Sequence, residues 1–191
     1  MTELITRIFI KDSENVKDNT VRKAYGTLGG IVGIICNLIL CIIKITVGLI
    51  SGSISILADG FNNLSDMGSY LVTIIGFKLA GKPADRDHPF GHGRMEYMSA
   101  FIVSVLILIV GVDLMESSLR SLIGNTNPPT YNIWAISVLI ISVLVKLWMF
   151  VFNRKLGNKI SSDVLKATAK DSLNDTLATT AILISVGVSL L

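Results

Sequence analysis

The residues of this sequence that are best suited to chemistry are carboxyl and amide side chains inside two otherwise apolar segments. They are Asp59, Asn62, Asn63 and Asp66 in the first segment and Asp171, Asn174 and Asp175 in the second. Asn62 and Asp66 are four residues apart, as are Asp171 and Asp175, so each pair would lie on one face of a helix. An acidic residue is costly inside a membrane, and its presence there indicates a functional site.

The segments that carry these residues have the composition of membrane helices. The chain has 191 residues, of which 51% are hydrophobic, and its mean hydropathy is +0.64. Uncharged runs cover residues 24–43, 98–112, 130–145 and 176–191, close to the ~20 residues that cross a bilayer as helix. We expect an all-α, polytopic transmembrane helix bundle, because helices satisfy their own backbone in lipid. The five expected spans are 26–50, 54–79, 97–121, 131–152 and 164–188.

The basic residues predict the orientation of the bundle. They gather in 1–24, 78–94 and 154–166, whereas the connections 51–53 and 120–130 hold only Arg120. By the positive-inside rule, we expect a multi-pass protein of the cell membrane with a cytoplasmic N-terminus. Residues 1–24 would form a cytoplasmic tail and 25–191 the transmembrane domain. The net charge of +3 gives no indication of a nucleic-acid partner.

The depth of the acidic residues predicts one shared site. At ~1.5 Å per residue, Asp66 lies roughly 20 Å and Asp175 roughly 17 Å from the inner ends of their helices. Asn62, Asp66, Asp171 and Asp175 would then form an all-oxygen metal site near the bilayer midplane. Such ligands suit Mn²⁺, Mg²⁺ or Ca²⁺, whereas zinc sites usually include His or Cys. The competing interpretation is that these groups only hydrogen-bond between helices.

Charge balance adds protons to this hypothesis. Three carboxylates facing one dication leave a negative charge, so we expect a proton to share the site and to compete with the metal. Asp59, one turn farther out, could be an accessory ligand, a proton relay or part of an outer vestibule. Lys44 and Lys146 lie several residues inside their spans, and we expect both to extend toward the nearer membrane surface.

Three motifs resemble the cation diffusion facilitator family. They are the run from Ser53 to Asp59 followed by Asn62-x-x-x-Asp66, the run from Asp87 to Glu96, and Asp171-x-x-x-Asp175. The resemblance implies a homodimeric, six-helix exporter that exchanges cytoplasmic divalent metal for protons. It assigns the metal site to Asn62, Asp66, Asp171 and Asp175, a combination similar to the manganese-exporting branch. The family's sixth helix and cytoplasmic C-terminal domain are expected to be missing from this chain.

The connection between the second and third expected spans contains a second candidate metal site. Asp85, Asp87, His88 and His92 lie within eight residues of one another, and some family members bind metal in this loop. The alternative interpretation is that these groups cap the third helix and bind lipid headgroups.

Together these features predict an alternating-access Mn²⁺/H⁺ antiporter that exports metal from the cytoplasm. The alternatives are a Zn²⁺, Fe²⁺ or broad-range divalent cation carrier, a non-transporting membrane metal sensor or scaffold, and, less favoured, a channel. We find no nucleophile–base pair that would indicate an enzyme, and we expect no prosthetic group. The expected partners are the metal ion, protons, the lipid bilayer and a second copy of the chain.

Overall fold

The described part of the protein is built from helices alone. The structure, a computed structural model, describes residues 2–10, 14–16, 18–51, 54–123 and 133–189. Within these residues there are six helices and no strand, which confirms the all-α prediction. The helices are α1 (Thr2–Phe9), α2 (Asn19–Ser51), α3 (Ile54–Ala80), α4 (Met95–Ile123), α5 (Ile133–Lys159) and α6 (Asp163–Ser189).

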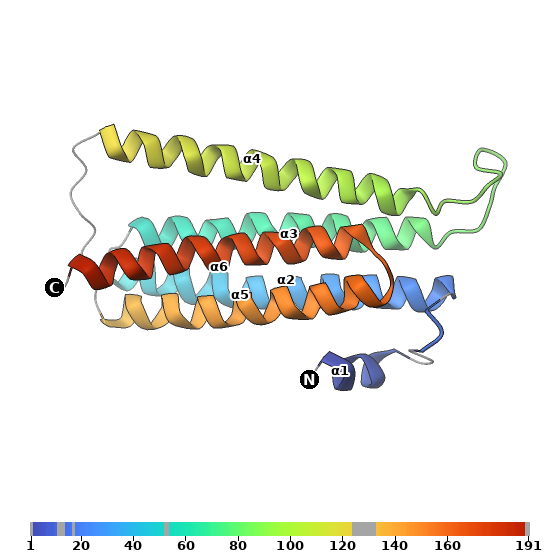
Figure 1. The fold of residues 1–191 in the computed structure, drawn as a ribbon, viewed down its shortest axis with the longest axis horizontal. Coiled ribbons are helices and arrows are strands. Elements are labelled where there is room, and N and C mark those ends of the chain that lie inside the picture. The colour runs from blue at the N-terminus through green and yellow to red at the C-terminus, as the bar shows by residue number, and fades with distance from the viewer. Residues whose placement is uncertain (1, 11–13, 17, 52–53, 124–132, 190–191) are drawn as a thin grey trace.

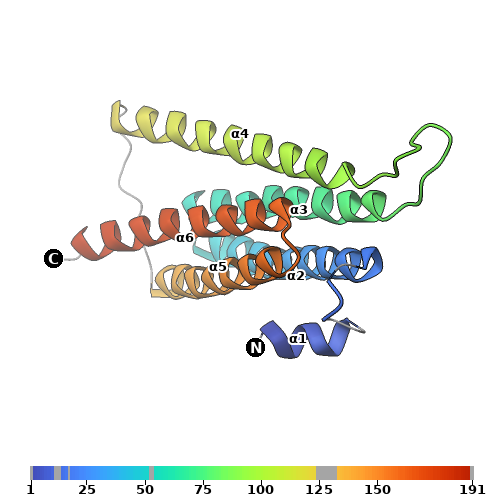
Figure 2. The ribbon, with the colours of Figure 1, turned by 45° about the vertical axis from the view of Figure 1, so that its right-hand side comes forward.

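The five long helices lie side by side in one bundle, and consecutive helices run in opposite directions (Figure 1). Helix α2 packs against α3 and α5, α6 packs against α5, and α4 lies along α3 and α6. The two views agree that α4 covers the side of the bundle opposite α2 and α5 (Figure 2). Helices α3 and α6, which carry the acidic pairs, are therefore the helices between α4 and the rest of the bundle.

Three of these helices have segments that are long and apolar enough to cross a membrane. The segments are Asn19–Ile50, Met95–Asp113 and Ile136–Lys159. Among the described residues, α3 and α6 contain no segment that is as long and as apolar, because their many polar and acidic residues lower their hydropathy. Large apolar side chains are exposed along the bundle, for example Ile35, Leu71, Phe101, Leu144 and Leu177. Lipid is the solvent that can accept such a surface.

Two helices extend beyond the spans expected from sequence by seven residues each. Helix α2 begins at Asn19 rather than near residue 26, because the Asp18 carboxylate accepts hydrogen bonds from the Thr20 amide (2.7 Å) and hydroxyl (2.6 Å). Such an N-terminal cap favours an early helix start. Helix α5 continues to Lys159 rather than ending near residue 152. The first two residues of that expected span, 131 and 132, lie outside the described residues.

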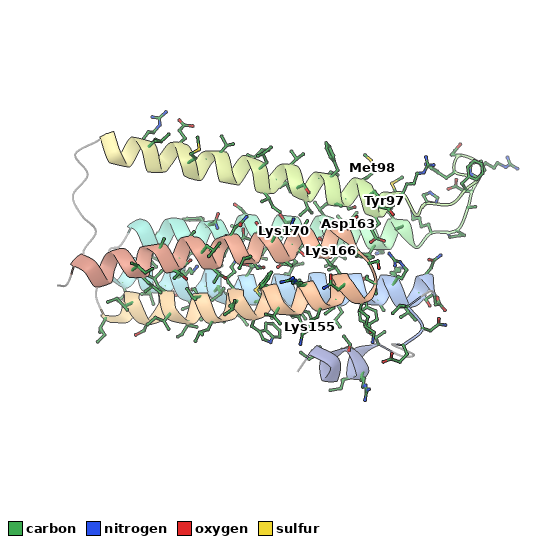
Figure 3. All side chains as sticks on the ribbon, viewed as in Figure 1. Tyr97, Met98, Lys155, Asp163, Lys166 and Lys170 are labelled. Carbon is green, nitrogen blue, oxygen red and sulfur yellow. The ribbon has the colours of Figure 1, made fainter. Side chains whose placement is uncertain are left out.

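The ends of helices that carry most of the basic residues lie together, and we call this the basic end. It comprises the start of α2, the 81–94 connection and the 160–162 connection (Figure 1). Lys155 and Lys166 lie toward it, in the right-hand half of Figure 3. At this end the Arg22 guanidinium bonds the Glu96 carboxylate (3.0 Å) and the backbone carbonyl of Ile160. One side chain of α2 thus joins α4 and the α5–α6 connection.

The N-terminal segment is partly helical, which the sequence did not predict. Ile10, which follows α1, is buried in an apolar cluster that includes Val21 and Tyr25 of α2 and Phe152 of α5. This cluster holds the segment against the basic end.

Glycines set how closely α2 approaches α3. A Cβ atom added to Gly26 would lie 2.1 Å from the Phe77 ring, and one added to Gly33 would lie 2.2 Å from the Tyr70 ring. Both rings are almost completely buried. Side chains of α3 therefore rest directly on the backbone of α2, as small residues permit in membrane helices.

Candidate metal centre

The structure brings together three of the four expected ligands. Asp66 of α3 and Asp171 and Asp175 of α6 each offer a carboxylate oxygen, and these oxygens lie within 4.8 Å of one another. Asp66 and Asp171 are buried and Asp175 is half-buried. The i, i+4 spacing places Asp171 and Asp175 on one face of α6, and the packing of α6 against α3 brings that face to Asp66.

A lysine from a third helix lies inside this cluster. The Lys146 ammonium of α5 donates to Asp66 Oδ2 (2.6 Å) and to Asp175 Oδ2 (2.5 Å), and the residue is only 3% exposed. The expectation that Lys146 reaches toward the membrane surface is therefore wrong. Two carboxylates at close range compensate the charge of the buried ammonium, so it does not need to reach water at the membrane surface.

The cluster is short of positive charge. Asp66 and Asp175 share the Lys146 ammonium, whereas Asp171 forms no ion pair with any of the described residues. With all three carboxyl groups ionised, the cluster carries a net charge of two negative units. A buried excess of negative charge is unfavourable in low dielectric, and one dication would neutralise it.

The fourth expected ligand is less well defined by the structure. Asn62 is half-buried on α3, one turn before Asp66, and within the described residues it makes no recorded hydrogen bond. The adjacent Asn63 is buried, and its amide donates to the Asp59 carbonyl (3.2 Å), while its own side-chain oxygen has no hydrogen bond in the described part of the chain.

Asp59 has a counterion of its own. Its carboxylate lies 2.8 Å from the Lys44 ammonium of α2, and Lys44 is 1% exposed. The expected extension of Lys44 toward the surface is therefore also wrong. Because this ion pair compensates the charge of Asp59 locally, it favours a structural role over the accessory ligand, proton relay and vestibule roles considered from sequence, although Asp59 Oδ2 accepts no well-aligned hydrogen bond in the described part of the chain.

A chain of buried hydrogen bonds lies next to the cluster. The Asn153 amide donates to the Tyr70 hydroxyl (3.1 Å), and the Tyr70 and Ser172 hydroxyls are 3.1 Å apart. Tyr70 lies one turn after Asp66 on α3, and Ser172 follows Asp171 on α6. This polar chain joins the same three helices as the carboxylate cluster, on its basic-end side. Sequence reasoning missed it, because single Tyr, Ser and Asn residues carry no spacing signal.

The loop between α3 and α4 forms a second cluster, from three of its four candidates. Asp85, His88 and His92 offer ligand atoms within 4.8 Å of one another, while Asp87 is not part of the group. The Asp85 carboxylate lies 3.3 Å from His88 Nδ1 and 3.4 Å from His92 Nε2. The two imidazole rings are 4.4 Å apart between centroids.

Further contacts orient the groups of the loop cluster. The His92 Nδ1 atom lies 3.1 Å from the Pro83 carbonyl, to which a protonated Nδ1 donates, and Nε2 on the other side of the ring faces Asp85. The backbone amide of His88 donates to the Asp85 carboxylate (2.7 Å). This bond, with smaller contributions from both imidazoles, holds the pKa of Asp85 below its ordinary value.

Comparison with known proteins identifies the family. Residues 30–191 match the cation efflux transmembrane domain. The chain belongs to the cation diffusion facilitator family. Membership confirms the resemblance read from the sequence motifs.

The curated relatives of this chain include proteins named as a transporter, a manganese efflux protein and a magnetosome protein. The uncharacterized transporter YdbO of Bacillus subtilis is 31% identical over 161 residues, covering 84% of this chain and 55% of the relative. The manganese efflux system protein MneP of the same organism is 31% identical over 156 residues, covering 82% and 52%. The magnetosome protein MamM of Paramagnetospirillum magneticum is 31% identical over 157 residues, covering 82% and 49%. The chain spans about half the length of these curated relatives.

Proposed function

We propose that this protein exports divalent metal from the cytoplasm, with Mn²⁺ as its main cargo and protons as the counter-transported ion. The observation that carries the proposal is the buried cluster of three carboxylates with a single ammonium among them. A cluster with two uncompensated negative charges is matched by one dication. Its protein ligands would be Asp66, Asp171 and Asp175, with Asn62 as the fourth.

The choice of Mn²⁺ rests on the oxygen character of the site. No His or Cys belongs to the membrane cluster among the described residues, and carboxylate and amide oxygens suit hard dications such as Mn²⁺. The relative MneP is named a manganese efflux protein, and this name supports the same cargo. A broad-range carrier that also accepts Zn²⁺ or Fe²⁺ is the nearest alternative, because oxygen ligands discriminate weakly among divalent ions.

Lys146 changes the argument for protons. Counting three carboxylates against one dication required a proton in the loaded site, but the Lys146 ammonium supplies a positive charge in the cluster or, if the metal displaces it, close beside the cluster. Protons are instead needed after the metal leaves, when two negative charges remain in a low dielectric. Exchange of one dication for protons then keeps the cluster near neutrality in both loaded and empty states.

The basic end supports the proposed orientation of the transporter. By the positive-inside rule, its many Lys and Arg residues favour a cytoplasmic location for this end and for the N-terminal tail 1–24. The word efflux in the name of the relative MneP supports export as the direction of transport. Alternating access would open the carboxylate cluster first to this end and then to the opposite one. The resemblance to the family supports a homodimer.

The loop cluster favours a second candidate function, metal sensing. Asp85, His88 and His92 combine a carboxylate with two imidazoles at the basic end, a ligand set typical of zinc sites. A non-transporting sensor would bind metal here and move none across the membrane.

Flux into proteoliposomes tests these alternatives. We expect full-length protein under an imposed pH gradient to carry Mn²⁺ faster than Zn²⁺, with proton movement in the opposite direction. Because histidine favours zinc, Asn62→His should shift the ratio of the two rates toward Zn²⁺ by about tenfold. Equal or faster Zn²⁺ transport by the wild type would contradict the manganese assignment. Conduction without proton coupling would indicate a channel, and metal binding without flux would indicate the sensor.

A further inference from the structure

The ammonium of Lys146 occupies the place that a cation would take between Asp66 and Asp175. Its nitrogen lies 2.6 and 2.5 Å from one oxygen of each, and metal–oxygen bonds are of the order of 2.0–2.2 Å. A dication bound to both carboxylates would therefore lie very close to the ammonium. Two positive charges at such a distance repel strongly where water is excluded.

We propose that Lys146 is a tethered competitor of the transported cation. Metal binding displaces the ammonium from Asp66 and Asp175, and the ammonium returns to them when the metal leaves. This inference rests on the proposed metal site and adds to it a residue that sets the affinity of that site. The empty transporter then never exposes three carboxylates without any cation among them.

The side chain of Lys146 and its surroundings permit this movement. Lysine carries its charge at the end of a flexible four-carbon stem, so the ammonium can move without a change of backbone. Ser142 lies one turn earlier on α5, on the same face of the helix and in the direction in which helical side chains lean. Its hydroxyl is buried and has no hydrogen-bond partner among the described residues. We assign Ser142 as the acceptor of the displaced ammonium.

A second buried lysine offers a matched control. Lys44 is equally buried, but it pairs with Asp59 alone, and neither residue belongs to the carboxylate cluster. Replacing Lys44 removes one buried positive charge from the protein without removing a competitor from the metal site.

Equilibrium binding of Mn²⁺ to the full-length protein in lipid nanodiscs tests the proposal. We expect Lys146→Met to bind Mn²⁺ about tenfold more tightly than the wild type. In the wild type the ammonium must first leave Asp66 and Asp175 before the metal can bind, and the variant has no such requirement. Lys44→Met should bind within about threefold of the wild type. Unchanged or weaker binding by Lys146→Met would overturn the proposal.

A second measurement separates displacement from a general effect of charge and does not require the variant to fold. In a structure of the wild-type protein with Mn²⁺ bound, the Lys146 nitrogen should lie beyond hydrogen-bonding distance of both Asp66 and Asp175. An ammonium that still bonds both carboxylates beside the metal would overturn the proposal.

The proposed metal site has its own control in the same experiment. Asp171→Asn removes a ligand that makes no ion pair with Lys146 in the described structure. This variant, with Lys146 present, should bind Mn²⁺ more weakly than the wild type. If the wild type binds no Mn²⁺, or if Asp171→Asn binds it equally well, the metal site itself is wrong. If Asp171→Asn weakens binding while Lys146→Met does not tighten it, only the competitor is wrong.

Discussion

The carboxylate cluster in the bundle and the Asp–His cluster in the loop are built in opposite ways. The bundle cluster draws its residues from α3, α5 and α6 and includes a buried ammonium. The loop cluster draws all three residues from one short segment, forms no ion pair with a lysine or arginine in the described part of the chain, and leaves two of its residues exposed. Water screens the loop charges, whereas the buried charges must be compensated by neighbouring groups. A counterion is therefore a requirement of the buried site and not of the exposed one.

The largest effect on transport is expected from removing one carboxylate of the bundle cluster. Asp175→Asn removes a carboxylate that contacts Lys146 and faces the other two, so we expect the initial rate of Mn²⁺ transport to fall by about 100-fold or more. Asp163→Asn is the matched control, because Asp163 is an exposed residue at the start of the same helix. Comparable rates for Asp175→Asn and the wild type in proteoliposomes would contradict the role of the cluster.

A smaller effect is expected at the second buried ion pair. Lys44→Met leaves the half-buried Asp59 carboxylate without its partner, and we expect a loss of roughly 1–3 kcal/mol in the free energy of unfolding. Thermal unfolding in detergent measures this change. The double variant Lys44→Met with Asp59→Asn should recover most of the loss, because no unpaired charge then remains. A double variant as unstable as the single one would show that the pair is not the source of the stability.

The smallest effect is expected at the loop. His92→Ala removes one of the two imidazoles, and we expect Zn²⁺ binding to the purified protein to weaken by about tenfold. Asp87→Ala is the control, because Asp87 lies in the same loop but outside the cluster. Mn²⁺ flux should change by less than about threefold, since the loop ligands are separate from the bundle ligands. A loss of flux as large as that of Asp175→Asn would contradict this separation and indicate that the loop ligands are needed for transport.

The sequence predicted the parts of the molecule that depend on spacing along one helix or one loop. The pairing of Asp171 with Asp175 follows from i, i+4 spacing, and the depth of Asp66 follows from helix rise. The loop group of Asp85, His88 and His92 was also within reach, because its members are close in sequence. The excluded loop residue, Asp87, shows that closeness in sequence does not decide which way a side chain points.

The pairing of Lys146 with the carboxylates could not be predicted from the sequence, for a different reason. Lys146 was judged from its position on its own helix, where extension to the membrane surface satisfies an isolated ammonium. The depth of Lys146 did contain a signal, since it lies roughly 20 Å before Lys159, at a level similar to that of Asp66 and Asp175. Using it requires knowledge that α5 lies beside α3 and α6, which only the packing of the bundle supplies.

The close seating of α3 on the glycines of α2 has a consequence for motion. Rings that rest on backbone leave no room for sliding, so α2 and α3 should move as one rigid pair. Helices α5 and α6 form the other extensively packed pair. Asp66 belongs to the first pair, whereas Lys146 and Asp175 belong to the second. The carboxylate cluster therefore straddles the seam between two rigid bodies, and rocking at that seam would separate Lys146 from Asp66 more than from Asp175.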